Sequence, residues 1–396
     1  MHPMLHRATC VLIGGIGAAV FAATLSAQRS AAVPPSEANH FIETPAGWEH
    51  PKTPWGEPSL EGTWPIPAGI NLERGCSPTF GRGGRGRGGA DPATPPPPCD
   101  PTAPWLSDAE WALRVENAQR RAKEGDPATL ALAKGDLAGA LRGVTDPTTL
   151  LRQRSIIMDP LNGRLPELTA EGKRRSALMK SSWALSQAEV QTWDHWEDFD
   201  SWDRCITRGM PTSMMAYRYN NGIKIFQSPG AVVLSLEMIH EDRIVYTDGR
   251  APLKPVHAHY MGEPRGRWEG NTLVVVTTNY KEGPSGTNIG VYGSPQGNRW
   301  PVSDQMKTTE RFTRLNNDQI LYEMTVEDPV IMTRPYTVRF PLELDPNYEW
   351  WEYACHEGNR TIRDYITSSR AERADRAAGA GEQPTAPASG PGSGGR

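Results

Sequence analysis

The stretch "QILYEMTVE", Gln319–Glu327, decides the fold because its apolar and polar residues alternate. One face of the stretch carries the apolar side chains, which are Ile320, Tyr322, Met324 and Val326. A period of two predicts a β-strand with one buried face and one exposed face. The turn "NND" before it leads back to another alternating stretch, "MKTTERFTRL" (306–315), which predicts a hairpin.

The same period extends in both directions from this hairpin. Upstream strands are predicted from Ile223 onward, in "IKIFQ", "AVVLSLEMI", "RIVYT" and "RWEGNTLVVVTTNY". Downstream strands are predicted in "RPYTVRFPLEL" (334–344) and "YEWWEYA" (348–354). Successive strands joined by short turns form an antiparallel meander, and about eight strands remove their free edges by closing into a barrel. Such a barrel can hold side chains or one small ligand.

The region before the strands favours helices. "SDAE", Ser107–Glu110, is a capping box that opens a predicted helix to about Lys123. Further helices are predicted within 126–143 and 169–185, and after a second capping box, "SQAE" (186–189). We therefore expect an α+β fold, with a helical N-terminal portion packed on a C-terminal antiparallel barrel.

The N-terminus predicts export. A short basic start precedes an apolar run from Cys10 to Leu25 and a small-residue cleavage site, which is typical of a signal peptide and too short for a membrane span. We expect a soluble periplasmic or extracellular protein. The predicted organisation is a signal peptide at 1–27, an extended leader at 28–54, a partly helical region at 55–222 with a Gly/Arg/Pro-rich loop at 81–98, a barrel at 223–370 and a disordered tail at 371–396.

Export changes how the cysteines are interpreted. Four remain after cleavage, and an even number in an oxidising compartment predicts disulfides. Three pairings are possible, and we favour Cys76–Cys99 and Cys205–Cys355. Cys355, in "WWEYACHEGNR", is then a structural residue and not a nucleophile.

Several classes of chemistry are disfavoured. The net charge of −4, together with export, argues against nucleic acid as a partner. Gly81, Gly83 and Gly86 match a dinucleotide fingerprint, but the flanking strand and helix are missing. His257 and His259 share one face of an extended segment, yet no third metal ligand is marked. We expect neither a cofactor nor a metal.

The best candidate for chemistry lies in "EMIHEDRIVYTDGR", Glu237–Arg250. Glu237 interrupts an apolar strand, His240 follows at the strand end, and Arg243 lies in the next strand. Placed together in a dry lumen, they could act as acid/base, orienting group and stabiliser of negative charge. A structural ion-pair network that fixes strand register is the alternative.

Other polar residues on neighbouring strands and turns are candidate ligand-binding residues at the barrel mouth. They are Tyr219, Asn220, Arg250, Arg311, Glu323, His356 and Glu357.

Four motifs carry a family resemblance. "RGRWEGNTLVVVTTNY" (265–280), "ERFTR" (310–314), "LYEMTVEDPVIMTRPYTV" (321–338) and "YACHEGN" (353–359) resemble a large, essentially uncharacterised family of exported bacterial proteins. The resemblance implies a lipocalin-like barrel and no particular activity. His257 and His259 depart from the expected pattern, so they carry less weight as a family site.

The sequence leaves three functions open. The leading one is binding of a small-molecule ligand in the barrel, without nucleic acid or stable membrane insertion. The alternative is a cofactor-free acid/base enzyme, a hydrolase, lyase or isomerase, using His240, Glu237 and Arg243. The third is an interaction protein whose barrel is fully packed. The sequence does not indicate the oligomeric state.

Overall fold

The computed structural model describes residues 44–67, 70–75, 100, 102–124, 151–180, 182, 192–215, 219–254, 258–282 and 300–378. Outside these residues lie the predicted signal peptide, the loop at 81–98, the helices predicted within 126–143, the second capping box and the tail beyond 378.

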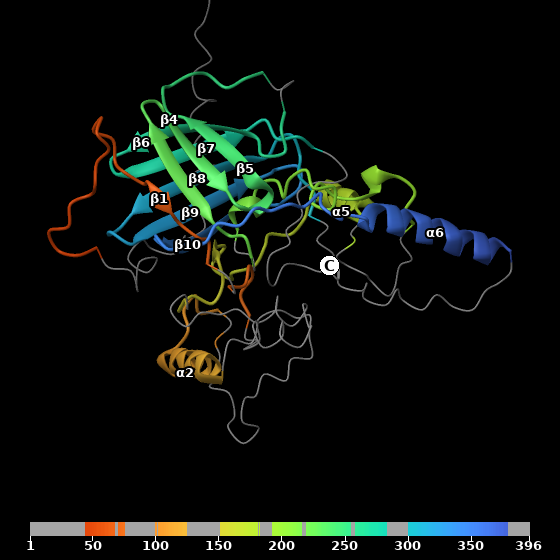
Figure 1. Ribbon diagram of the computed structural model, residues 1–396, viewed down its shortest axis with the longest axis horizontal. Coiled ribbons are helices and arrows are strands. Elements are labelled where there is room, and N and C mark those ends of the chain that lie inside the picture. The colour runs from red at the N-terminus through yellow and green to blue at the C-terminus, as the bar shows by residue number, and fades with distance from the viewer. Residues whose placement is uncertain are drawn as a thin grey trace, which may run out of the picture.

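Ten strands form one sheet that curls into a half-barrel (Figure 1). Their order is β1-β3-β4-β5-β6-β7-β8-β9-β10-β2, and every neighbouring pair is antiparallel except β5 and β6. The strands are β1 Gly62–Thr63, β2 Ile157–Asp159, β3 Ile223–Ser228, β4 Ala231–Leu236, β5 Glu241–Tyr246, β6 Glu263–Glu269, β7 Thr272–Thr278, β8 Lys307–Arg314, β9 Gln319–Glu327 and β10 Tyr336–Glu343.

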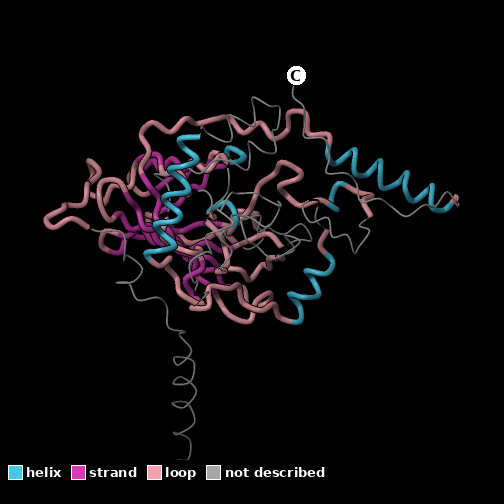
Figure 2. The backbone as a smooth tube through the Cα atoms, turned by 90° about the horizontal axis from the view of Figure 1, so that it is seen from below, coloured by secondary structure: helices cyan, strands magenta, loops and turns pink. Residues whose placement is uncertain are grey.

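Helices make up a small part of the described chain, which gives the fold its α+β character. They are the α-helices α2 Asp108–Glu124, α5 Ala170–Leu178 and α6 Thr361–Ala377, and the 3₁₀ turns η2 Trp196–Asp198, η3 Thr212–Met214 and η4 Met238–His240. In Figure 1 α2 lies below the sheet and α6 projects away from it, and Figure 2, seen from below, shows a helix in front of the strands. No described helix has both the length and the apolar character needed to cross a bilayer.

The alternation in Gln319–Glu327 is confirmed. All four apolar residues of its inner face are at most 2% exposed, while Glu323 and Thr325 are partly exposed. The inner face of β10 follows the same rule, because Tyr336, Val338 and Phe340 are buried. These side chains form one continuous core with those of β3, β4, β7 and β8. Burying this face is what fixes the register of each strand.

One stretch of chain contacts both margins of the sheet. At the first margin Trp64 N donates to Ile223 O, whereas Thr63 O accepts from Asp345 N just after β10, near the second margin. A few residues later Asn71 O accepts from Ile156 N beside the second margin. We call residues 62–67 and 70–72 the strap, since they contact both open edges of the half-barrel.

The seam between β5 and β6 is covered by a separate segment. The two strands pair only at Tyr246 and Arg265. Thr207 Oγ1 donates to Glu241 Oε2 at 2.5 Å, and Met210 N donates to Tyr260 O at 3.4 Å. The segment 207–215 is largely buried, and three of its methionines join the core. It therefore fills a gap that strand pairing leaves open.

Two sequence predictions about secondary structure are wrong and one is confirmed. The aromatic stretch 348–354 is not a strand, because its backbone runs irregularly into a turn. Residues 361–370 were expected in the barrel and 371–377 in a disordered tail, but both belong to α6. The capping box is present, with Glu110 N donating to Ser107 Oγ at 3.3 Å.

Candidate functional site

A buried ion pair crosses the interior of the half-barrel. Arg243 enters from β5 and Glu310 from β8, and their side chains are 1% and 0% exposed. The contact is bidentate, with Arg243 Nη1 donating to Glu310 Oε1 at 2.9 Å and Nη2 donating to Oε2 at 2.5 Å. Two planar groups matched in this way give the geometry that best offsets the cost of burying two charges.

Hydroxyl groups extend this pair into a polar layer. Tyr322 Oη donates to Glu310 Oε1 at 2.9 Å, and Arg243 Nη2 lies 3.4 Å from Thr277 Oγ1. In the adjacent cross-strand row, Thr308 Oγ1 lies 2.6 Å from the hydroxyl of Tyr280. We use "polar layer" for seven residues, which are Arg243, Thr277, Tyr280, Thr308, Glu310, Tyr322 and Tyr336.

The low polarity around the layer shifts its proton affinities. Burial raises the pKa of Tyr280, Tyr322 and Tyr336, so the three phenols stay neutral. Burial alone would lower the pKa of Arg243, but the Glu310 carboxylate outweighs that effect and raises it. At neutral pH the layer therefore keeps Arg243 charged and its three phenols neutral.

Two buried polar atoms of the layer lack a hydrogen-bond partner among the described residues. The Tyr336 hydroxyl and Arg243 Nε are buried, and neither has a hydrogen-bond partner among the described residues. Tyr336 lies in the same cross-strand row as Thr308, with Val326 between them. Buried polar atoms are nearly always satisfied, so each unsatisfied atom in this layer indicates a place where another polar molecule can bind.

The sequence-predicted group of Glu237, His240 and Arg243 is not assembled. Among the described residues no side-chain contact joins any two of the three, and the one link is a backbone hydrogen bond from His240 N to Glu237 O at 3.1 Å. Glu237 is 1% exposed and sits at the end of β4, while His240 is exposed, with Nδ1 3.3 Å from Tyr353 O. Arg243 points into the half-barrel toward Glu310 instead.

Glu237 is instead the centre of a hydrogen-bonded latch. Its Oε1 accepts from Asn220 Nδ2 and Trp351 N, both at 2.9 Å. Its Oε2 accepts from Gly222 N at 3.1 Å and from the Tyr348 hydroxyl at 2.6 Å. Burial and this carboxylate raise the pKa of Tyr348. The predicted mouth residue Asn220 therefore serves to hold Glu237.

Three further predicted ligand-binding residues lie on surfaces away from the polar layer. Arg250 pairs with Asp248, and both are exposed. Arg311 pairs with Glu269 on the outer face at 2.9 Å. Glu323 pairs with Arg339 across β9 and β10 at 2.5 Å. Strand alternation explains the placement of two of them. Successive side chains point to opposite faces, so Arg311 next to Glu310 and Glu323 next to Tyr322 both point outward.

The remaining predicted site residues cluster outside the sheet near the disulfide. Tyr219 stacks parallel to Tyr353 with ring centroids 6.4 Å apart. His356 and Glu357 are exposed in a turn and close no strand. The Cys205–Cys355 disulfide is confirmed, whereas Cys76, Cys99 and His257 lie outside the described residues.

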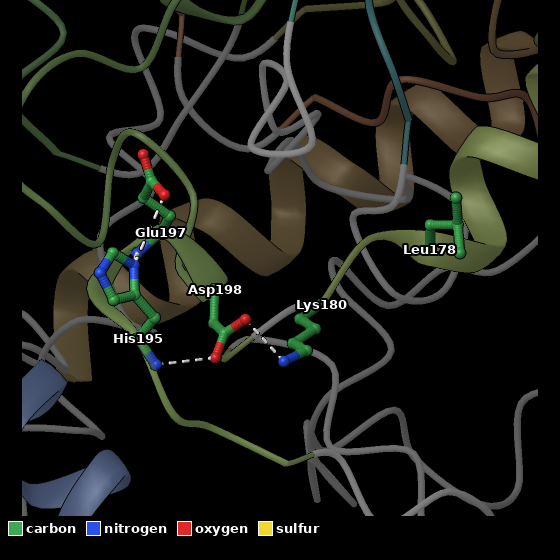
Figure 3. A pocket seen from close by; sticks show the side chains of 5 residues that line it. All are labelled: Leu178, Lys180, His195, Glu197 and Asp198. Carbon is green, nitrogen blue, oxygen red and sulfur yellow. Dashed lines mark hydrogen bonds and ion pairs between the residues drawn. The ribbon is translucent and has the colours of Figure 1, made fainter.

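A surface cleft of about 490 Å³ lies elsewhere, near η2 (Figure 3). It is lined by Leu178, Lys180, His195, Glu197 and Asp198. Lys180 Nζ contacts Asp198 at 2.6 Å, and His195 Nδ1 lies 3.5 Å from Glu197. Its charged groups are thus engaged with one another, and we do not take this cleft as the functional site.

Of the polar layer, only Arg243 was predicted as a site residue from the sequence, and Tyr322 was predicted on the buried face without a polar role. A usable signal was present in "TTERFTR", where Thr308, Glu310 and Phe312 share one face of a strand. A carboxylate on the face that also carries a phenylalanine indicates a buried, paired acid.

Comparisons with known proteins give no name to this arrangement. No family model, no curated protein and no solved structure matches the chain. The family resemblance of its motifs therefore stays a prediction.

Proposed function

We propose that the protein is exported and binds a small molecule inside the half-barrel, which serves as a lipocalin-like barrel with the polar layer as its site. The strap supports the closed form of the barrel, because it contacts both open edges of the sheet. The Cys205–Cys355 disulfide supports export, since such bonds persist in oxidising compartments.

The observation that carries the binding proposal is that two buried atoms of the polar layer, the Tyr336 hydroxyl and Arg243 Nε, have no partner among described residues. Both atoms can donate a hydrogen bond, so the ligand should present oxygen acceptors. Arg243 is already neutralised by Glu310. A charged ligand would leave an unbalanced charge in a dry interior, which favours an uncharged molecule bearing carbonyl or hydroxyl groups.

The core contains side chains that can rearrange to admit such a ligand without unfolding. Methionines recur in the core cluster that contains Tyr280, Tyr322 and Tyr336; they are Met210, Met214, Met215, Met261, Met306, Met324 and Met332. Methionine is unbranched and changes rotamer at low cost, so it adapts to a guest better than branched residues do.

Catalysis is not the function that this geometry supports best. The expected acid/base group would need the side chain of His240 beside those of Glu237 and Arg243, and the three side chains have separate partners. Binding is therefore the simpler use of the site.

The test is native mass spectrometry of the purified full chain, followed by thermal-shift screening of uncharged oxygen-rich molecules. We expect one bound molecule per chain. Tyr336→Phe removes one donor and should weaken binding by about tenfold, yet stabilise the empty protein by about 1 kcal/mol, because it deletes an unsatisfied hydroxyl. Tyr246→Phe, on the outer face of β5, should change neither property.

The contradicting outcome is equally specific. If no molecule is retained or bound by the full chain, and Tyr336→Phe destabilises it, then ordered water satisfies these atoms and the barrel interior is structural.

A further inference from the structure

An exposed apolar row crosses the outer face of β3, β4 and β5. Phe226, Val233 and Ile244 are direct cross-strand neighbours, and their inward-facing neighbours Ile225 and Leu234 are buried. Phe226 is 53% exposed, Ile244 is 46% exposed, and Val233 is partly exposed between them. Single exposed apolar residues are common on protein surfaces, but a contiguous row of three marks an interaction surface.

Charges of opposite sign flank this row at its two ends. The next cross-strand row is Lys224, Ser235 and Asp242, so the cation lies on β3 and the anion on β5. Lys224 Nζ sits 4.5 Å from the centroid of the Trp350 ring, which holds the ammonium on this face. Asp242 is exposed. The surface therefore has an apolar centre and a charged rim, with the cation on the β3 side and the anion on the β5 side.

We propose that this face binds the same face of a second copy of the chain. A two-fold axis parallel to β4 and passing above Val233 exchanges β3 and β5. It places Phe226 against Ile244 of the partner subunit and Lys224 against the partner's Asp242. Because the interface is isologous, each of these contacts forms twice.

The charge pattern favours a second copy over an unrelated partner. A cation and an anion at equal distances from a central residue are complementary to their own two-fold image, without any further adjustment. Sheets packed face to face keep their strands within about 30° of one another, which this axis allows. No part of this inference depends on the proposed ligand site, which lies on the opposite face of the strands.

The first test is the mass of the full chain in solution, measured by analytical ultracentrifugation over a concentration series. We expect a dimer. Ile244→Lys places an unpaired charge in the apolar centre and should raise the dimer dissociation constant by at least about 100-fold. Leu161→Lys is the matched control, because Leu161 is 48% exposed but follows β2 at the other margin of the sheet.

A charge exchange tests the orientation of the two copies. Lys224→Asp and Asp242→Lys should each weaken the dimer by about tenfold, since each creates two like-charge contacts. The double variant restores opposite charges and should recover most of the affinity. Lys224→Asp also removes the Lys224–Trp350 contact within each monomer. If that loss alone weakened the dimer, the second change at Asp242 would not restore the affinity.

Cross-linking tests the position of the axis. Val233→Cys should form a disulfide with its own counterpart, whereas Phe226→Cys should cross-link only when mixed with Ile244→Cys. A wild-type chain that is monomeric at every concentration overturns the proposal. So does a dimer that Ile244→Lys leaves intact, or capture of a different protein on this face.

Discussion

At the scale of single residues, position in the strand decides the partner, and partners can be far apart in sequence. Arg243 was expected beside Glu237, six positions earlier, but it pairs with Glu310, which is 67 residues away. The turn η4 separates the first two, since Ile239 and His240 both adopt positive φ angles, of 61° and 40°. The sequence gives little signal for this left-handed pair, because Ile239 is β-branched and such residues rarely adopt positive φ.

The pH dependence of folding stability can test whether the Glu241 carboxyl group is buried. Burial raises its pKa above the usual value of 4.5, although Thr207 and Arg243 act in the opposite direction. A raised carboxyl pKa means that the folded state favours the protonated form. The stability contributed by this proton is complete below the unfolded pKa and is lost as pH rises through the folded pKa.

Glu241→Gln should therefore become progressively more stable than wild type as pH rises from 4 to 8, by urea unfolding at each pH. Glu269→Gln is the contrasting control. Arg311 and Arg267 lower the pKa of Glu269, so its contribution is lost as pH falls. Parallel pH profiles for wild type and Glu241→Gln would show that Glu241 is not desolvated in solution.

At the scale of elements, local alternation predicted most strands but could not predict what replaces a strand. The stretches that became β9 and β10 carry the clearest period of two. The stretch 348–354 is rich in Trp and Tyr, which favour strands. The backbone of this stretch does not pair with a strand, because Trp351 N donates its hydrogen bond to the Glu237 side chain.

The latch at Glu237 should hold this irregular segment against the sheet. Glu237→Gln keeps the shape but leaves only one accepting oxygen for four donors, so we expect the free energy of unfolding to fall by about 1–3 kcal/mol. Emission from Trp350 and Trp351 should also shift to longer wavelength as the segment loosens. Glu269→Gln, at an exposed ion pair, should lower the free energy of unfolding far less. An equal loss in both variants would argue against the latch.

At the scale of the whole molecule, the sequence predicted the α+β fold class and one covalent link, and it predicted a closed barrel where the sheet forms a half-barrel, but it did not predict the elements at the margins. Cys205–Cys355 could be favoured from the count of cysteines and the compartment. By contrast, β1 and β2 are too short to show a period, with two and three residues. The strap and the segment 207–215 owe their conformations to contacts with strands that are distant in sequence. Such contacts leave no local sequence pattern.

The disulfide spans a sequence separation of 150 residues, so its loss should destabilise the whole protein. The loop-entropy relation gives about 5 kcal/mol for a loop of this length, and measured values are commonly about 2–4 kcal/mol. We expect Cys205→Ser/Cys355→Ser to lower the free energy of unfolding by about 3–5 kcal/mol in urea denaturation. A loss below about 1 kcal/mol would mean that the unlinked chain stays compact when unfolded.

The strap has a consequence for how the chain is assembled. Its partners at Ile223, Asp345 and Ile156 are all made after it during synthesis, and the most distant belongs to the end of the last strand. Contacts so remote in sequence form slowly, because a long loop must close first. Although it is translated before all three partners, the strap is therefore expected to dock late, and mechanical pulling from the N-terminus should detach it before the strands from β3 onward yield.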